Sequence, residues 1–262
     1  MYRPAWHSDM KRSVPIRTTD YLLVDISNSY TKFTFASTKR ISPPVRIVTN
    51  RLSSTLFLRF LKQRRVRQVM VSSVVPEKNS VISKAAGKTG VLWLDSTLKL
   101  AVGIDYPAPE SIGADRLANA AAVAALYGCP AIVVDFGTAV TFDIVSARRN
   151  YIGGVIAPGL EAMTNFLYQR TALLPKLSLK EPRRAIGRST IGAMLSGAVF
   201  GYRGLVREIL ARIRAEEFPR KKLHIVATGG YARLIAAQLP EITAVRPHLT
   251  LEGLRIIANL NS

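Results

Sequence analysis

Two stretches of this chain, 110 positions apart, share one design, and this internal repeat limits the possible folds more than any other feature. Each begins with an apolar run, delivers an aspartate, passes through a turn of small residues and leaves as a second strand. The first stretch runs from Val24 to Thr31, and the second from Val134 to Thr141. The repeat therefore predicts a duplicated domain.

Two such hairpins that face each other across a cleft can hold a phosphate chain. Small residues let backbone N–H groups approach the anion, while the aspartates hold its cations. One turn alone would be weak evidence, because Asp-x-Gly-Thr also occurs in ordinary turns. Two in matching register predict a phosphoryl-transfer site.

Composition narrows the class of protein. The chain has 262 residues, 48% of them hydrophobic, which is enough for two domains with cores of their own. One cysteine and three scattered histidines supply neither a disulfide framework nor a zinc site. No apolar run approaches the roughly 18 residues of a membrane span, and residues 1–19 lack the apolar core of a signal peptide. We therefore expect a cytoplasmic protein with no membrane partner.

The net charge of +20 leaves a second class of function open. Basic clusters such as residues 62–67 would add affinity for the phosphates of nucleic acid. These clusters are spread along the chain, however, and no DNA-reading motif or aromatic-interleaved stripe accompanies them. A basic surface that attracts anionic substrates is the preferred interpretation. The alternative is a non-catalytic regulator that binds nucleic acid or a protein partner.

The pattern of elements predicts an α/β fold, because strands alternate with helices. Residues 1–19 are expected to be a disordered basic leader, followed by one domain over 20–129 and a second over 130–262. Strands are expected over two stretches between 21 and 37 and over 68–75, 92–94, 131–135, 139–146, 151–157 and 224–228. Helices are expected over 54–63, 116–127, 190–215 and 232–238, and from about residue 160.

The segment Gly113-Ala114-Asp115-Arg116 places an acid beside a base where a loop enters a helix. An aspartate at a helix start is common, since it interacts favourably with the helix dipole. The preceding turn-rich loop, however, is of the kind that lines a substrate pocket. Asp115 could accept a proton from a substrate hydroxyl, and Arg116 could hold an anionic group.

Three weaker motifs complete the sequence evidence. Gly87-Lys88-Thr89 is similar to the end of a P-loop, but Ile82 replaces the first glycine, so we expect no phosphate site there. Gly229-Gly230 lies between a strand and a helix, where its backbone could approach adenosine or ribose. Thr190 begins a helix and is by default an N-cap, or equally a ligand contact.

Taken together, these residues resemble the type III pantothenate kinases, a branch of the sugar kinase, hexokinase, Hsp70 and actin superfamily. The resemblance covers about Tyr21 to Asn261, and its most specific pieces are residues 113–116, 135–138, 153–160 and 228–230. It implies two ribonuclease H-like domains related by duplication, with the active-site cleft between them. The implied reaction is transfer of the ATP γ-phosphate to the primary hydroxyl of pantothenate, the first step of coenzyme A synthesis. A kinase of this fold with another hydroxyl-bearing small acid as acceptor is a further possibility.

The resemblance also implies roles for individual residues. Asp115 would be the general base, and Asp135 would bind a monovalent cation, K⁺ or NH₄⁺. The pantothenate-binding positions would be Tyr106, Gly113, Ala114, Asp115, Arg116 and Thr190. The ATP-binding positions would be Asp25, Ile26, Ser27, Asn28, Ser29, Tyr30, Thr31, Lys32 and Thr138. The family further implies Mg²⁺ and a homodimer whose substrate pocket lies near the subunit interface.

The first turn departs from the family pattern, which usually has glycine where this chain has Ser27. If the turn needs a positive φ at that position, serine costs on the order of 1 kcal/mol and narrows the approach of the phosphates. On that condition, the sequence predicts weakened ATP binding.

Overall fold

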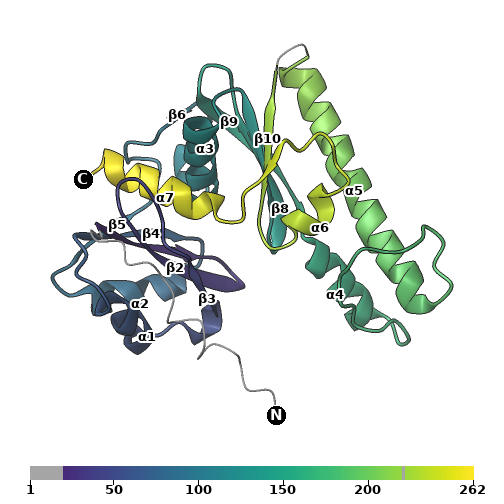
Figure 1. Ribbon diagram of the computed structural model, residues 1–262, viewed down its shortest axis with the longest axis horizontal. Helices are drawn as coiled ribbons and strands as arrows, with labels where there is room; N and C mark the ends of the chain where they lie inside the picture. The colour runs from purple at the N-terminus through teal and green to yellow at the C-terminus, as the bar shows by residue number, and fades with distance from the viewer. Residues whose placement is uncertain (1–19, 220–221) are drawn as a thin grey trace.

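The computed structural model describes residues 20–219 and 222–262, which form two lobes, each built on a mixed β-sheet (Figure 1). The predicted leader, residues 1–19, lies outside the described residues. The first sheet has the order β3-β2-β1-β4-β5. Its strands are β1 (Tyr21–Ile26), β2 (Tyr30–Ala36), β3 (Val45–Val48), β4 (Gln68–Ser73) and β5 (Gly90–Trp93).

The second sheet repeats this order as β9-β8-β7-β10-β11, with β6 added beside β9. In both sheets the first strand pairs antiparallel with the second and parallel with the fourth. The duplicated α/β fold is therefore confirmed. The strands are β6 (Gly103–Ile104), β7 (Ala131–Phe136), β8 (Ala139–Val145), β9 (Asn150–Pro158), β10 (His224–Thr228) and β11 (Ala244–Val245).

Helices cover both faces of each sheet, as the continuous apolar runs of β1 and β7 require. On the outer side of the first sheet lie α1 (Ser54–Leu61) and α2 (Pro76–Ala86). Between the sheets lie α3 (Ala114–Leu126) and α7 (Leu249–Leu260), whose core includes Leu23 of the first sheet and Val133 of the second (Figure 1). The second sheet is covered on its other side by α5 (Thr190–Glu217) and α6 (Ala232–Ala236), while α4 (Leu160–Arg170) follows β9.

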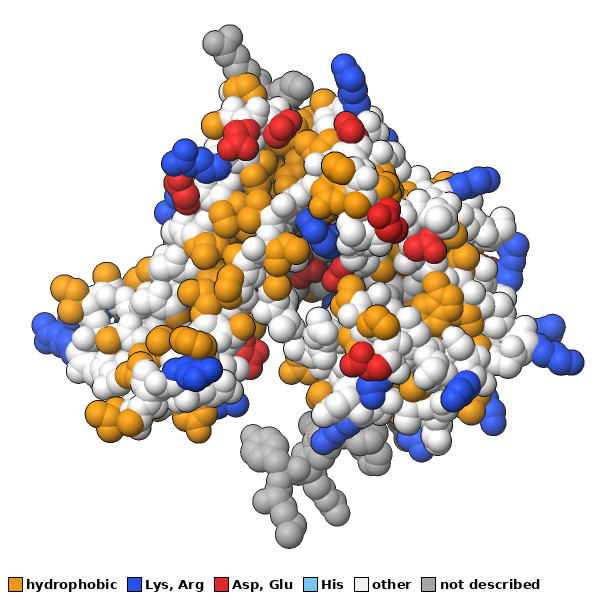
Figure 2. Space-filling view, turned by 180° about the vertical axis from the view of Figure 1, so that it is seen from behind, with side chains coloured by type: hydrophobic (Ala, Val, Ile, Leu, Met, Phe, Trp, Pro, Cys, Tyr) orange, Lys and Arg blue, Asp and Glu red, His pale blue; other side chains and the backbone are white. Residues whose placement is uncertain are grey.

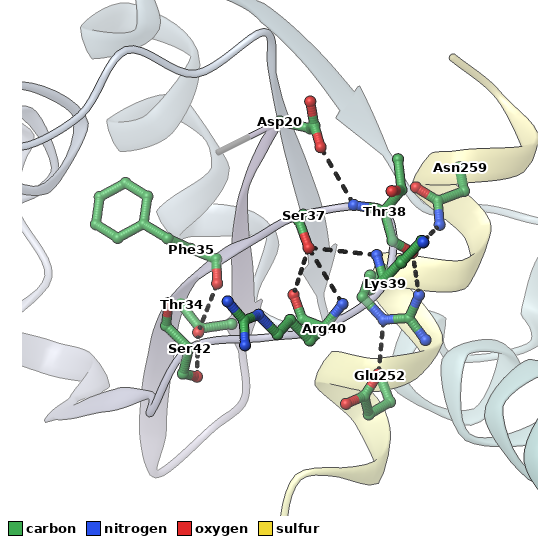
Figure 3. A network of polar contacts seen from close by, with 11 residues as sticks. Asp20, Thr34, Phe35, Ser37, Thr38, Lys39, Arg40, Ser42, Glu252 and Asn259 are labelled. Atoms are coloured by element: carbon green, nitrogen blue, oxygen red, sulfur yellow. Dashed lines mark hydrogen bonds and ion pairs between the residues drawn. The ribbon is translucent and has the colours of Figure 1, made fainter. Parts of the chain in front are cut away.

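Polar contacts tie α7 to the turn that follows β2 (Figure 3). The side chains of Arg255 and Asn259 both donate to the backbone carbonyl of Thr38. Arg255 Nε also donates to Glu252 Oε2 at 2.7 Å, which fixes the guanidinium on the helix. The last helix of the chain therefore completes the inner face of the first lobe.

Several elements were not predicted from the sequence, namely the short strands β3, β6 and β11 and the helices α2 and α7. Gly87 has φ +59° and ends α2, so Lys88 and Thr89 follow a helix, whereas a P-loop precedes one. The absence of a P-loop is therefore confirmed. The division into 20–129 and 130–262 stays a prediction, and both β6 and α7 pack across it. In the described part of the chain, no helix is both long and apolar enough to cross a membrane.

Candidate active site

The two repeated turns meet across a hollow between the lobes. Ser29 Oγ in the first turn and Thr138 Oγ1 in the second are 2.8 Å apart, within hydrogen-bonding distance. In the space-filling view, acidic and basic side chains lie together in this hollow (Figure 2). The two halves of the repeat thus face one another, as their sequence predicted.

The first turn is organised around the buried carboxylate of Asp25 at the end of β1. Lys32 Nζ lies 3.2 Å from Asp25 Oδ2, and Ser27 Oγ donates to Oδ1 at 3.3 Å. Burial lowers the pKa of Lys32, but the charges of Asp25 and Asp135 outweigh it, so the pKa is raised. Lys32 is therefore a cation that joins the aspartates of both turns.

Ser27 is not strained. Arg149 is the one non-glycine residue with a positive φ in the described chain, so Ser27 lies outside the region that favours glycine. Gly137, the matching position of the second turn, has no positive φ either. The condition for weakened ATP binding is therefore not met, because the turn needs no left-handed residue here, and backbone strain at Ser27 gives no reason to expect weaker binding.

Asp115 lies in the first turn of α3, where the helix dipole favours a negative charge. Burial opposes that charge, and the carboxylates of Asp25, Asp143 and Asp135 add to the opposition. Together they raise the pKa of Asp115 from its ordinary value of 3.8 to about 7, although the backbone N–H of Arg116 donates to its Oδ1 at 2.9 Å. Near neutral pH this carboxyl group can therefore both hold and release a proton.

Arg116 is held by an aspartate that sequence reasoning missed. Its Nε donates to Oδ1 of the fully buried Asp143 at 2.6 Å. Arg116 Nη2, Asp143 Oδ2 and the hydroxyl of Tyr151 are buried without a hydrogen-bond partner among the described residues. A Cβ on Gly154 would meet Arg116 Nη2 at 2.1 Å, so only glycine leaves room for the guanidinium. Burial raises the pKa of Asp143 to about 6, against the charge of Arg116.

Asp135, in the second turn, is oriented by a chain of hydrogen bonds from two helices. Asn119 Nδ2 of α3 donates to Asp135 Oδ2 at 3.2 Å, and Thr250 Oγ1 of α7 donates to Asn119 Oδ1 at 2.9 Å. Burial raises the pKa of Asp135 by more than Lys32 and the Asn119 amide lower it, so the pKa lies above its ordinary value. The orientation of this carboxylate therefore depends on the last helix.

The charges around the hollow leave an excess of carboxylates. Asp25, Asp115, Asp135 and Asp143 lie with only two cations, Lys32 and Arg116, among their partners. The described residues contain no group of three or more His, Cys, Asp or Glu side chains arranged to hold a metal ion. Cations bound with nucleotides usually take one or two carboxylates and complete their shell with phosphate oxygens and water. The donor set fits a cation of that kind.

Two facing turns of small residues with aspartates beside them are what a phosphoryl-transfer site needs, and the comparison of sequences identifies the family. The profile of the family described as type III pantothenate kinase matches residues 21–212. This chain belongs to the type III pantothenate kinase family. A type III pantothenate kinase of Akkermansia muciniphila is 49% identical over 92% of this chain and 99% of its own length. One from Methylacidiphilum infernorum is 42% identical over 91% and 88%.

Solved structures agree on the fold. A Campylobacter jejuni protein named for the Baf family of transcriptional activators superposes with a TM-score of 0.57 at 20% identity, over 92% of this chain and 98% of its own. The activator of the 2-hydroxyisocaproyl-CoA dehydratase from Clostridium difficile gives 0.51 at 10% identity, over 92% and 93%. At such identities the likeness concerns the actin-like ATPase fold alone. The activity follows from the family: this pantothenate kinase is an ATP-dependent phosphotransferase of coenzyme A biosynthesis.

The remaining predicted positions of this type III kinase are not all in one place. Tyr106 packs edge-to-face on Tyr151, with ring centroids 6.0 Å apart, beside Arg116. Ile26 and Thr31 are fully buried, so neither residue reaches the surface of the hollow. Thr190 is exposed in the first turn of α5, which lies well away from α3 in Figure 1. The prediction that Thr190 is the N-cap is wrong, because Ser189 caps the helix by accepting a hydrogen bond from Gly192 N.

The two glycines after β10 differ in role. Gly229 has φ +92°, and a Cβ there would meet Asp135 Oδ1 at 2.5 Å and the backbone of Phe136 at 2.6 Å. It therefore allows the loop to pack against the second turn. A Cβ on Gly230 would have nothing within 4 Å, so the open space that a nucleoside would need is at Gly230.

Proposed function

We propose that Asp115 is the general base of this pantothenate kinase. It would take the proton of the primary hydroxyl of pantothenate while the γ-phosphoryl group leaves ATP. The phosphates of ATP would lie between the two turns in place of the contact between Ser29 and Thr138. The observation that supports this role most is the pKa of about 7, because a base works best when its pKa is close to the working pH. Holding donor and acceptor in line is most of what phosphoryl transfer requires.

Arg116 and its surroundings would bind the acceptor. The side chain of Arg116 is 15% exposed, and Asp143 fixes its guanidinium through Nε. The accessible part of a guanidinium held in this way can donate a hydrogen bond to an oxygen of pantothenate. Tyr106, packed on Tyr151, would close the same pocket.

The cations would be shared between carboxylates and phosphates. Asp135 would hold the monovalent cation, K⁺ or NH₄⁺, and Asp25 lies close enough to contribute to the charge that attracts Mg²⁺. Such cations offset the charge of the phosphates when they are bound with ATP.

The same kinase would act as a homodimer. Large apolar side chains are exposed on α4, on the loop after it and at the start of α5, over one lobe of Figure 2. Exposed apolar surface of this kind is typical of an interface between subunits. The first turn of α5 belongs to this surface, so Thr190 would serve the pantothenate pocket of the partner subunit. The side chains are Phe166, Tyr168, Leu173, Ile186 and Ile191.

The test is ADP release by the purified protein with ATP, Mg²⁺ and K⁺, with pantothenate present and then omitted. We expect release that requires pantothenate and that falls when Na⁺ replaces K⁺. Pantothenate-dependent release that is unaffected by Asp115→Asn would refute the role of the base. Sedimentation of the protein as a monomer would refute the dimer and would leave the proposed role of Asp115 unaffected.

A further inference from the structure

The first sheet carries a row of three charged side chains, only two of which the reaction scheme uses. Asp25 of β1 lies opposite Lys32 of β2, and Lys32 lies opposite Arg46 of β3. Residues directly opposite in a sheet point to the same face. Leu23 alternates with Asp25 on this face and packs in the core of α3 and α7. The row therefore faces the second lobe.

Lys32 and Arg46 are like charges in neighbouring positions, an arrangement that destabilises a sheet. Burial and the charge of Arg46 both work against the protonated form of Lys32, which Asp25 compensates at 3.2 Å. Arg46 has no such compensation, since none of the ion pairs in the described part of the chain includes it. Although carboxylates are in excess in the hollow as a whole, Asp25 and Asp135 offset the charge of Lys32, and Arg46 forms no ion pair with either of them.

Arg46 is nevertheless held in a defined position. Its guanidinium carbon lies 3.6 Å from the ring centroid of Tyr30, the first residue after the phosphate turn. Across the hollow, both side chains are within electrostatic range of the Tyr231 hydroxyl, which donates to Glu161. Tyr231 directly follows Gly230, where the backbone leaves open space. Because stacking on Tyr30 fixes the guanidinium of Arg46 at the hollow, little side-chain entropy is lost when it contacts a ligand there.

We propose that Arg46 is a further ATP-binding residue, which contacts the polyphosphate chain beside Lys32. Phosphate oxygens lying between the two side chains would remove their mutual repulsion, and an arginine fork matches phosphate in geometry as well as charge. This inference rests on the proposed function, because it assumes that the phosphates lie between the two turns. It adds a residue from β3, outside both repeated turns, to the phosphate site.

The experiment compares Arg46→Gln and Arg46→Lys with Arg64→Gln as a matched control. Arg64 also stacks on an aromatic ring of β2, that of Phe35 at 5.1 Å, but Phe35 belongs to the outer core with α1. For each variant we would measure the KM for ATP, the KM for pantothenate and the inhibition constant of inorganic tripolyphosphate. Thermal unfolding checks that the variants are folded.

For Arg46→Gln we expect the KM for ATP and the inhibition constant of tripolyphosphate to rise roughly tenfold, equivalent to about 1.4 kcal/mol. The KM for pantothenate should stay unchanged, Arg46→Lys should lose less, and Arg64→Gln should behave as the wild type. Unchanged tripolyphosphate inhibition in Arg46→Gln would overturn the proposal. A raised KM for ATP without that change would also overturn it, because Arg46 would then contact the nucleoside.

Calorimetric titration with tripolyphosphate separates this inference from the proposed function. Binding that weakens in Arg46→Gln supports the phosphate contact even in a protein without pantothenate-dependent turnover. In a protein with normal turnover, equal binding by wild type and Arg46→Gln refutes the contact and leaves the kinase reaction in place.

Discussion

Replacing Asp115 by asparagine should abolish most of the turnover and at the same time stabilise the fold. A pKa raised from 3.8 to about 7 means that the folded protein resists ionisation of this carboxyl by about 4 kcal/mol as an upper limit, at about 1.4 kcal/mol per pKa unit. Between pH 4 and pH 7 the unfolded chain is ionised while the folded protein keeps its proton. Rising pH in this window therefore destabilises the wild type, and the full effect is present above pH 7.

The assay is urea unfolding of wild type and Asp115→Asn at pH 4 and pH 8.5, beside steady-state turnover. The variant should unfold with a free energy higher by up to about 4 kcal/mol at pH 8.5 and nearly equal at pH 4, while turnover falls by roughly 10²-fold or more. The matched control is Asp95→Asn, at an exposed carboxylate that accepts from Thr97, and it should change neither quantity. If wild type and Asp115→Asn have equal unfolding free energies at pH 8.5 as well as at pH 4, the carboxylate of Asp115 does not destabilise the fold and the assignment is refuted.

Three further predictions concern the turns and the groups that orient them. Ser27→Gly should leave the KM for ATP within about twofold of wild type, because serine is unstrained there; a clear drop in KM would contradict this. Asp143→Asn removes a charge that raises the pKa of Asp115 and releases Arg116, so the acid limb of the pH–rate profile should move below pH 7; an unmoved limb is the contrary result. Thr250→Val should raise the K⁺ concentration for half-maximal activity a few-fold, since one hydrogen bond contributes about 1 kcal/mol. Thr164→Val, at a buried helical threonine of α4, is its control, and an equal K⁺ requirement in both would argue against the Asn119 relay.

The repeat was visible in the sequence because its strands are continuous apolar runs that end in an aspartate. The same cue could have found Asp143, a single carboxylate between Phe142 and Ile144 in a buried strand. Asn119 could have been found as the lone amide in an alanine-rich helix. Each is a buried polar group that needs a partner.

Other features depend on contacts that local patterns do not encode. Arg46 became a candidate only when the register placed it opposite Lys32, and β3, with four residues, is too short to show a strand period in the sequence. The segment of α2 is largely polar, with Ile82 and Ala86 as its only buried residues. Thr190 shows the converse case, because its position along the chain does not reveal that the first turn of α5 lies away from α3 in the fold.

The position of α7 has a consequence for how the protein is made. Leu23 near the start of the chain and Leu254 near its end share one core, and Arg255 reaches Thr38 across 217 positions. During translation, the inner face of the first sheet stays uncovered by α7 until this helix has been synthesised. The amino-terminal lobe therefore cannot finish folding first, as domains in tandem usually do. Until α7 has been synthesised, nascent chains expose the apolar inner face of the first sheet.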